Sequence, residues 1–149
     1  MGLQVPVSLK NGHDSIHASL KRAMGEPGRT GEAARAVARI MDGHTLREEK
    51  FALRPLGLLK ALARGETPAE LAEVVRLTEG FQREMPQMID EHRQIAEALR
   101  LLAQAAEVEG KPEYVALAEE MIVHANIEEE VLYPAALLVG AYARRLRGG

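Results

Sequence analysis

The chain of 149 residues contains an internal repeat that places the same chemical groups at matching positions in its two halves. In each half a histidine is followed, 31 or 32 residues later, by a second histidine that has a glutamate four positions further on. The repeated groups are His13, His44 and Glu48 in the first half and His92, His124 and Glu128 in the second. Because self-similarity at a fixed offset marks duplicated supersecondary units, we expect two helix pairs related by an approximate two-fold axis.

The composition favours helices. Aromatic residues make up 3% of the chain and hydrophobic residues 46%, so a core must be built mainly from Ala, Leu, Ile, Val and Met. Most of these are good helix formers, and the length suits one domain. We therefore predict an all-α fold, an up-down-up-down four-helix bundle with a short C-terminal helix, as a single domain over residues 1–149.

Glycine and proline set the expected helix boundaries. Gly65 should stop a helix, and Thr67 to Glu70 read as a capping box that begins the next one. Gly80 and Pro86 are expected to interrupt that helix. The predicted main segments are 8–24, 32–55, 57–63, 85–109 and 113–132, with a short helix after Pro134.

The repeated side chains should face the interior of the bundle, because residues three, four and seven apart share one helix face. His13 lies in phase with Ile16 and Leu20, whereas His17 lies nearer the edge of that arc and is the weaker candidate ligand. The other predicted inward stripes are Val37, Ile40, Met41, His44, Glu48 and Phe51; Met85, Met88, Ile89, His92, Ala96 and Leu99; and Leu117, Met121, His124, Glu128 and Val131.

Carboxylates and imidazoles at core positions predict a bound cation. An unpaired ionised carboxylate in an apolar interior costs several kcal/mol. Since the chain has no cysteine, a metal must be held by imidazole and carboxylate. Imidazole suits iron, zinc, copper and nickel, and the two ligand types together discriminate poorly among divalent ions, so zinc or manganese are also open. We predict two metal ions held by the six repeated groups, with an oxo, hydroxo or water bridge that completes much of the shell and an open position on each ion for a small ligand.

Plainer interpretations of the same residues remain open. The histidines could be hydrogen-bonded core residues without a metal. Tyr133 could reach the site as a hydrogen-bond donor, although packing in the bundle is its expected role. Four methionines are expected to fill the core or to line a dry pocket: Met41, Met85, Met88 and Met121. Four glutamates are expected at the solvated edges of their helices or beside the ligands: Glu49, Glu91, Glu129 and Glu130.

Charge and hydropathy limit the expected partners. A net charge of -3 and a pI near 6.0 argue against a nucleic-acid partner, which would require a basic surface. The chain contains no apolar run of about 18 residues and no charged start followed by an apolar segment, so we expect no membrane partner and a cytoplasmic location. The sequence leaves the oligomeric state open between monomer and homodimer.

The repeated residues resemble a known family. Together with the strings EHRQI around His92 and HANIEEEVLYPAALL from His124, they resemble the hemerythrin-like HHE cation-binding domains over residues 13–138. The resemblance implies a left-handed up-down four-helix bundle that holds a carboxylate-bridged di-iron centre. Members of that family bind oxygen reversibly, sense oxygen, nitric oxide or iron, or take part in the repair of iron–sulfur clusters.

Two differences from that family point away from oxygen carriage. Oxygen-carrying hemerythrins have a second histidine one turn after the third-helix ligand, where this chain has Ala96, and an aspartate where this chain has Glu128. The pattern looks more similar to that of di-iron proteins of iron–sulfur repair. We expect a protein that binds or senses O2, NO or peroxide in oxidative or nitrosative stress protection. The alternatives are an iron store or donor for iron–sulfur cluster repair, and a redox enzyme that reduces peroxide or NO.

Overall fold

Long helices dominate the computed structural model, which describes residues 2–149. No β-strand occurs among these residues, so the all-α prediction is confirmed. The α-helices are α1 (Val7–Met24), α2 (Gly28–Glu48), α3 (Leu59–Ala63), α4 (Leu71–Val108), α5 (Pro112–Ile127) and α6 (Tyr133–Gly148). Three short segments have other helical geometry: the π-helical η1 (Glu49–Leu53) and η3 (Glu128–Leu132), and the 3₁₀-helical η2 (Arg54–Leu58). None of the described helices is long and apolar enough to cross a membrane.

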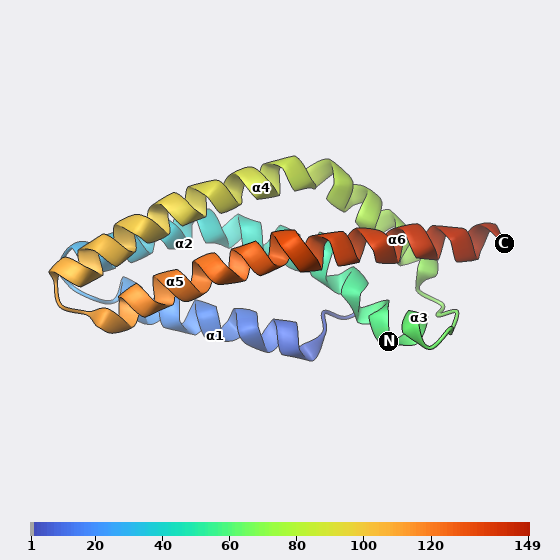
Figure 1. Ribbon diagram of the computed structural model, residues 1–149, viewed down its shortest axis with the longest axis horizontal. Helices are drawn as coiled ribbons and strands as arrows, with labels where there is room; N and C mark the ends of the chain where they lie inside the picture. The colour runs from blue at the N-terminus through green and yellow to red at the C-terminus, as the bar shows by residue number, and fades with distance from the viewer. Residues whose placement is uncertain (1) are drawn as a thin grey trace.

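Four long helical segments lie along the longest axis of the molecule: α1, α2, α4, and α5 continued by α6 (Figure 1). The α1–α2 and α4–α5 connections lie together at one end of the molecule, and α3 and the C-terminus lie toward the other. The four segments therefore pass one another near their middles, where side chains from all of them can meet.

Several helix boundaries differ from the prediction. α1 matches the expected segment within one residue at its start, and Gly65 ends α3 with the positive φ of 77° that favours glycine. α2 begins at Gly28, four residues earlier than expected. The expected capping box is wrong, because α4 begins only at Leu71 and its N-cap residue, Glu70, makes no side-chain capping bond.

The prediction that Gly80 and Pro86 interrupt the third long helix is wrong, since α4 is continuous over 38 residues. Gly80 is needed for close packing rather than for a break, because a Cβ there would lie 2.7 Å from Cε1 of Phe51. Pro86 lies on the exposed face, where water can satisfy the carbonyl that loses its N–H partner. Buried residues on both sides of the proline, Phe81 and Met88, hold the helix together, and it follows an arched path (Figure 1).

The two π-helical segments were not predicted, and they change which residues face inward. A π-helical turn contains an additional residue, so the helical phase after it is shifted. Val131, predicted to face inward, is 56% exposed, whereas Tyr133, directly after η3, is 1% exposed. Ile89 was also predicted inward and is 37% exposed, because Met88 and His92 occupy the buried face and one residue step rotates a side chain by about 100°.

Apolar packing lies on both sides of the middle of the bundle. One cluster of buried residues, including Ile16, Ile95 and Met121, joins α1, α2, α4 and α5 toward the end where the short connections lie. A second cluster, which includes Phe81 and Tyr133, joins η1, α4 and α6 on the other side. A polar layer between these clusters is therefore shielded from water along the axis of the bundle.

The close approach of α4 and α6 at Gly140 gives a stability prediction. A Cβ on Gly140 would lie 2.0 Å from Oγ1 of Thr78, and that hydroxyl is held by a 2.9 Å hydrogen bond to the Val74 carbonyl oxygen. Gly140→Ala should therefore lower the free energy of unfolding by about 1–3 kcal/mol, measured by denaturant titration. Gly43→Ala is the control, because a Cβ at Gly43 meets no atom within 4 Å and the alanine should be neutral or stabilising. Equal stabilities of the two variants would contradict the packing described here.

Candidate metal centre

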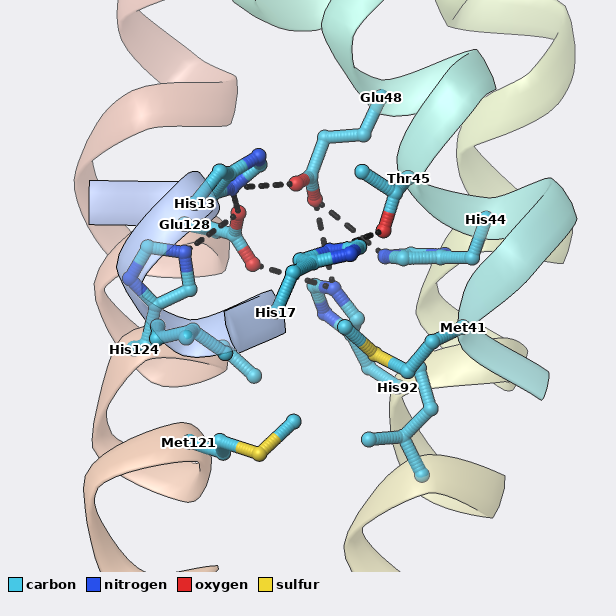
Figure 2. Close-up of a pocket in the computed structure, with 13 residues that line it drawn as sticks. His13, His17, Met41, His44, Thr45, Glu48, His92, Met121, His124 and Glu128 are labelled. Atoms are coloured by element: carbon cyan, nitrogen blue, oxygen red, sulfur yellow. Dashed lines mark hydrogen bonds and ion pairs between the residues drawn. The ribbon is translucent and has the colours of Figure 1, made fainter. Parts of the chain in front are cut away.

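The six side chains singled out by the repeat come together in the middle of the bundle (Figure 2). α1, α4 and α5 contribute one histidine each, α2 contributes a histidine and a glutamate, and the second glutamate is the first residue of η3. Five of the six are at most 6% exposed, and His124 keeps 27% of its side chain exposed. The structure therefore confirms the predicted interior position for five of these side chains, and His124 is partly exposed.

The six side chains form two groups of three, and the ligand atoms within each group lie within 4.8 Å of one another. The α1–α5 trio consists of His13, His124 and Glu128, and the α2–α4 trio consists of His44, Glu48 and His92. Each trio combines the lone histidine of one half of the chain with the His-x3-Glu pair of the other half. Either trio could hold a metal ion, and the repeat relates the two trios to each other.

Glu48 directs its two oxygens to different trios. Its Oε1 lies 3.1 Å from Nε2 of His13, which belongs to the α1–α5 trio. Its Oε2 lies 3.3 Å from Nε2 of His44 and 3.6 Å from Nε2 of His92. One carboxylate therefore faces both candidate metal positions.

Glu128 does the same from the opposite half of the repeat. Its Oε2 lies 3.1 Å from Nε2 of both His13 and His124. Its Oε1 lies 3.4 Å from Nε2 of His92, in the other trio. Two buried carboxylates that each face both positions have the arrangement needed to bridge a pair of cations.

The charges of this layer are balanced among its members. Burial lowers the pKa of His13, but hydrogen bonds with Glu128 and Glu48 outweigh it and raise that pKa to about 10. His92 has its pKa raised to about 10 for the same reasons. Burial raises the pKa of Glu48, and hydrogen bonds with Glu128 and the histidines hold it well below the usual range. Without a metal, imidazolium protons thus supply the positive charge that a cation would otherwise supply.

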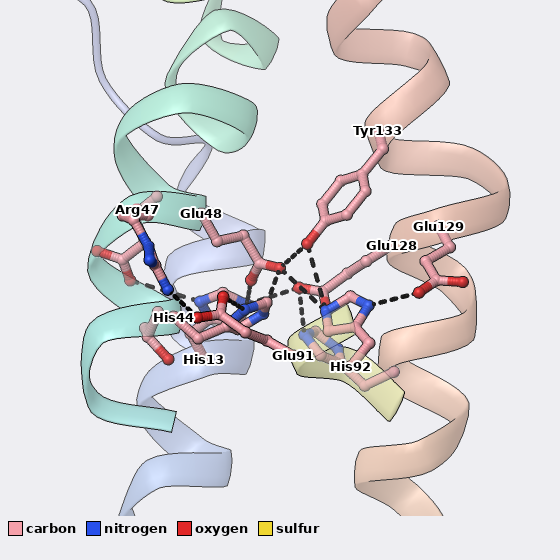
Figure 3. A network of polar contacts seen from close by, with 12 residues as sticks. His13, His44, Arg47, Glu48, Glu91, His92, Glu128, Glu129 and Tyr133 are labelled. Atoms are coloured by element: carbon pink, nitrogen blue, oxygen red, sulfur yellow. Dashed lines mark hydrogen bonds and ion pairs between the residues drawn. The ribbon is translucent and has the colours of Figure 1, made fainter. Parts of the chain in front are cut away.

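Three of the four histidines contact an outer carboxylate through the ring nitrogen that points away from the trio, and Figure 3 shows two of these carboxylates, Glu91 and Glu129. In each case Nε2 faces the trio and Nδ1 contacts a glutamate oxygen. These contacts are His13 to Glu49 at 3.4 Å, His44 to Glu91 at 3.0 Å and His92 to Glu129 at 2.9 Å. Such partners fix the ring orientation and the tautomer of metal-binding histidines. Of the two expectations for these glutamates, the structure supports the one that placed them beside the ligands.

His124 lacks a hydrogen bond at its inward nitrogen. Its Nε2 is buried and lies 3.1 Å from Oε2 of Glu128, yet the geometry makes no hydrogen bond. A core of hydrogen-bonded histidines would leave no such atom, because an unpaired buried polar nitrogen costs about 1–3 kcal/mol. A cation between His124 and Glu128 would satisfy both groups, so the residues present fit a metal.

Tyr133 belongs to the site, and the structure shows both roles considered for it, hydrogen-bond donation to the site and packing in the bundle. Its hydroxyl donates a hydrogen bond to Oε2 of Glu48 and lies 3.3 Å from Nε2 of His92 (Figure 3). The ring also packs edge-on against Phe81, with centroids 4.9 Å apart. The shift of helical phase in η3 turns Tyr133 inward, and helical periodicity alone could not have revealed it.

A cavity of about 30 Å³ adjoins the six side chains. It has room for about two water molecules, and Ile16, Ile95, Met41 and Met121 form its apolar wall. His17 also lines the cavity but belongs to neither trio, and its Nε2 lies 3.2 Å from Oγ1 of Thr45. The site is therefore shaped for a molecule of two or three atoms.

The raised histidine pKa values predict how the stability of the metal-free protein depends on pH. A pKa raised from 6.5 to about 10 on folding stabilises the protein below pH 6.5, and this stabilisation is lost as pH rises through 10. Denaturant titrations with a chelator present should show the free energy of unfolding falling by more than about 1.4 kcal/mol between pH 6.5 and 10. The free energy of unfolding of His17→Gln should depend on pH as it does in the original chain. Burial lowers the pKa of His17, so this residue does not contribute to the loss of stability above pH 6.5. A free energy that stays level over this range would show that the two imidazoles are neutral.

Comparison of the chain with protein-family models, with curated proteins and with solved structures finds no match. The assignment of the site therefore rests on the chain itself: the internal repeat, the two trios and the unpartnered nitrogen of His124.

Proposed function

We propose that this chain is a hemerythrin-like up-down four-helix bundle that holds two non-haem irons, one in each trio. The observation that carries the proposal is that Glu48 and Glu128 each direct one oxygen to each trio. Each iron would receive two imidazole nitrogens and one oxygen from each glutamate. Four protein ligands leave positions free on an ion that accepts six, and the absence of cysteine from the chain excludes thiolate ligands.

The small cavity supports a diatomic or peroxide ligand. Iron supplies the reversible one-electron chemistry that binding or reduction of O2, NO or peroxide requires. The wall around Met41 and Met121 is apolar, and a cavity of about 30 Å³ matches a ligand of a few atoms. We propose that the protein binds or senses such molecules in protection against oxidative or nitrosative stress.

Redox catalysis at the same centre is the second candidate, and Tyr133 is the observation that favours it. Its buried hydroxyl donates to Glu48, and burial together with the charges of Glu48 and Glu128 raises its pKa. The phenol therefore stays protonated and can act as a hydrogen-bond donor beside the candidate centre. Repeated turnover of peroxide or NO by the reduced protein distinguishes catalysis from binding.

Metal content tests the proposed centre directly. Protein purified in air after expression with added iron should contain close to two irons per chain and should absorb in the near ultraviolet as an oxo-bridged iron pair does. After reduction, O2, NO or peroxide should change that spectrum. Folded protein that takes up no iron would reject the proposal, and two equivalents of zinc or manganese in its place would retain the site but replace the redox function.

Single substitutions test the ligand assignment. His44→Ala and Glu128→Ala should each lower the metal content substantially, because each removes a side chain of a trio and Glu128 faces both. His17→Ala should leave the content nearly unchanged, since His17 lies outside both trios. Metal analysis of the three purified variants, with circular dichroism as the check on folding, decides between these outcomes. Equal losses in all three would mean that the first-helix ligand is misassigned.

A further inference from the structure

We propose that the two metal positions are unequal, and that the α1–α5 trio holds the exchangeable metal because Gly12 stands where the repeat requires a carboxylate. This inference rests on the proposed two-metal centre and adds which ion is loaded and lost first.

The inner parts of the two trios match. The repeat relates His13 to His92, His44 to His124 and Glu48 to Glu128. The rings of His44 and His92 have centroids 4.6 Å apart, and those of His13 and His124 have centroids 5.0 Å apart. The two histidine pairs therefore have closely similar spacing, and a difference between the positions must come from what surrounds them.

The outer carboxylates differ at one place. Glu91 directly precedes His92 and contacts Nδ1 of His44 at 3.0 Å, and Arg47 pairs with the same glutamate (Figure 3). The repeat places Gly12, directly before His13, at the position equivalent to Glu91. Among residues 2–149 no side chain forms a hydrogen bond with Nδ1 of the fourth histidine, His124. Three of the four histidines thus have an outer carboxylate, and Gly12 leaves the fourth, His124, without one.

Two features indicate that His124 is fixed less firmly than the other three histidines. Its side chain is 27% exposed, against 3–7% for the other three histidines. Among the described residues, its Nε2 is the only imidazole nitrogen that is buried and makes no hydrogen bond. Loss of an outer partner typically lowers metal affinity about 10–100-fold. The ion beside His124 should therefore leave faster than the ion held by His44 and His92.

Space is available for the missing group. A Cβ added at Gly12 meets no atom within 4 Å, so a side chain can begin there without displacing its neighbours. Gly12→Glu would place on α1 a carboxylate equivalent to Glu91 on α4, without the second contact that Glu91 makes with Arg47. The structure thus offers a variant that should gain metal retention, which a general disturbance of the fold would not produce.

Metal release to a chelator tests the inference. The full chain is loaded with two equivalents of Co²⁺ or Fe²⁺ without oxygen, and release to excess chelator is followed by absorbance. The original chain should lose one equivalent at least about tenfold faster than the other. Gly12→Glu should slow the fast phase by about tenfold or more, and Gly12→Ala, which has the gain in helix propensity without the carboxylate, should leave it unchanged.

A second variant, Glu91→Ala, tests the inference even if the glutamate introduced at position 12 does not reach His124. Glu91→Ala removes the partner of His44 and should convert the slow phase into a second fast phase. Release of both equivalents in one phase from the original chain would overturn the inference, as would an unchanged slow phase in Glu91→Ala. Failure of the original chain to bind either ion would instead reject the proposed centre itself, so the two failures are distinguishable.

Discussion

Two glutamates buried in an apolar interior are the constraint on which the rest of this structure depends. Glu48 and Glu128 are each 2% exposed, and an ionised carboxylate at such a position is tolerated only when positive charge or hydrogen-bond donors surround it. Four helical segments must therefore supply imidazoles at the same level of the bundle. Apolar clusters cover this layer on both sides along the axis of the bundle, and the low exposure of the two glutamates strengthens the electrostatic interactions that they make.

Helical periodicity was sufficient to predict the inner part of the site, because it depends on spacings within single helices. His44 and Glu48 share a face wherever their helix lies, and the repeat extends the same reasoning to His124 and Glu128. The outer contacts could not be predicted in this way. The contact of Glu91 with His44 joins α2 to α4, so it becomes visible only once the neighbouring helices are known.

The errors in the predicted fold also have non-local causes. The low helix propensity of Gly80 suggested a break in the helix. In the structure the helix is continuous, and the position needs a glycine because Phe51 of η1 packs so closely that it leaves no room for a Cβ. The π-helical segments lie at the two buried glutamates, since η1 directly follows Glu48 and η3 begins at Glu128, and no local pattern marks them. Their effect reaches the site, since the altered phase turns Tyr133 inward and Val131 outward.

The repeat makes the fold symmetric without making the chemistry symmetric. Tyr133 follows η3 directly and donates to Oε2 of Glu48, the oxygen that faces the α2–α4 trio. Its counterpart at the end of η1 is Leu53, 1% exposed, which can donate no hydrogen bond to Glu128. The α2–α4 trio thus has both an outer carboxylate on His44 and a phenol on its glutamate, and the α1–α5 trio has neither on His124 and Glu128. The two halves of the repeat thus differ at two places, Gly12 against Glu91 and Leu53 against Tyr133. Both differences favour the proposal that the α2–α4 trio holds its metal more firmly than the α1–α5 trio.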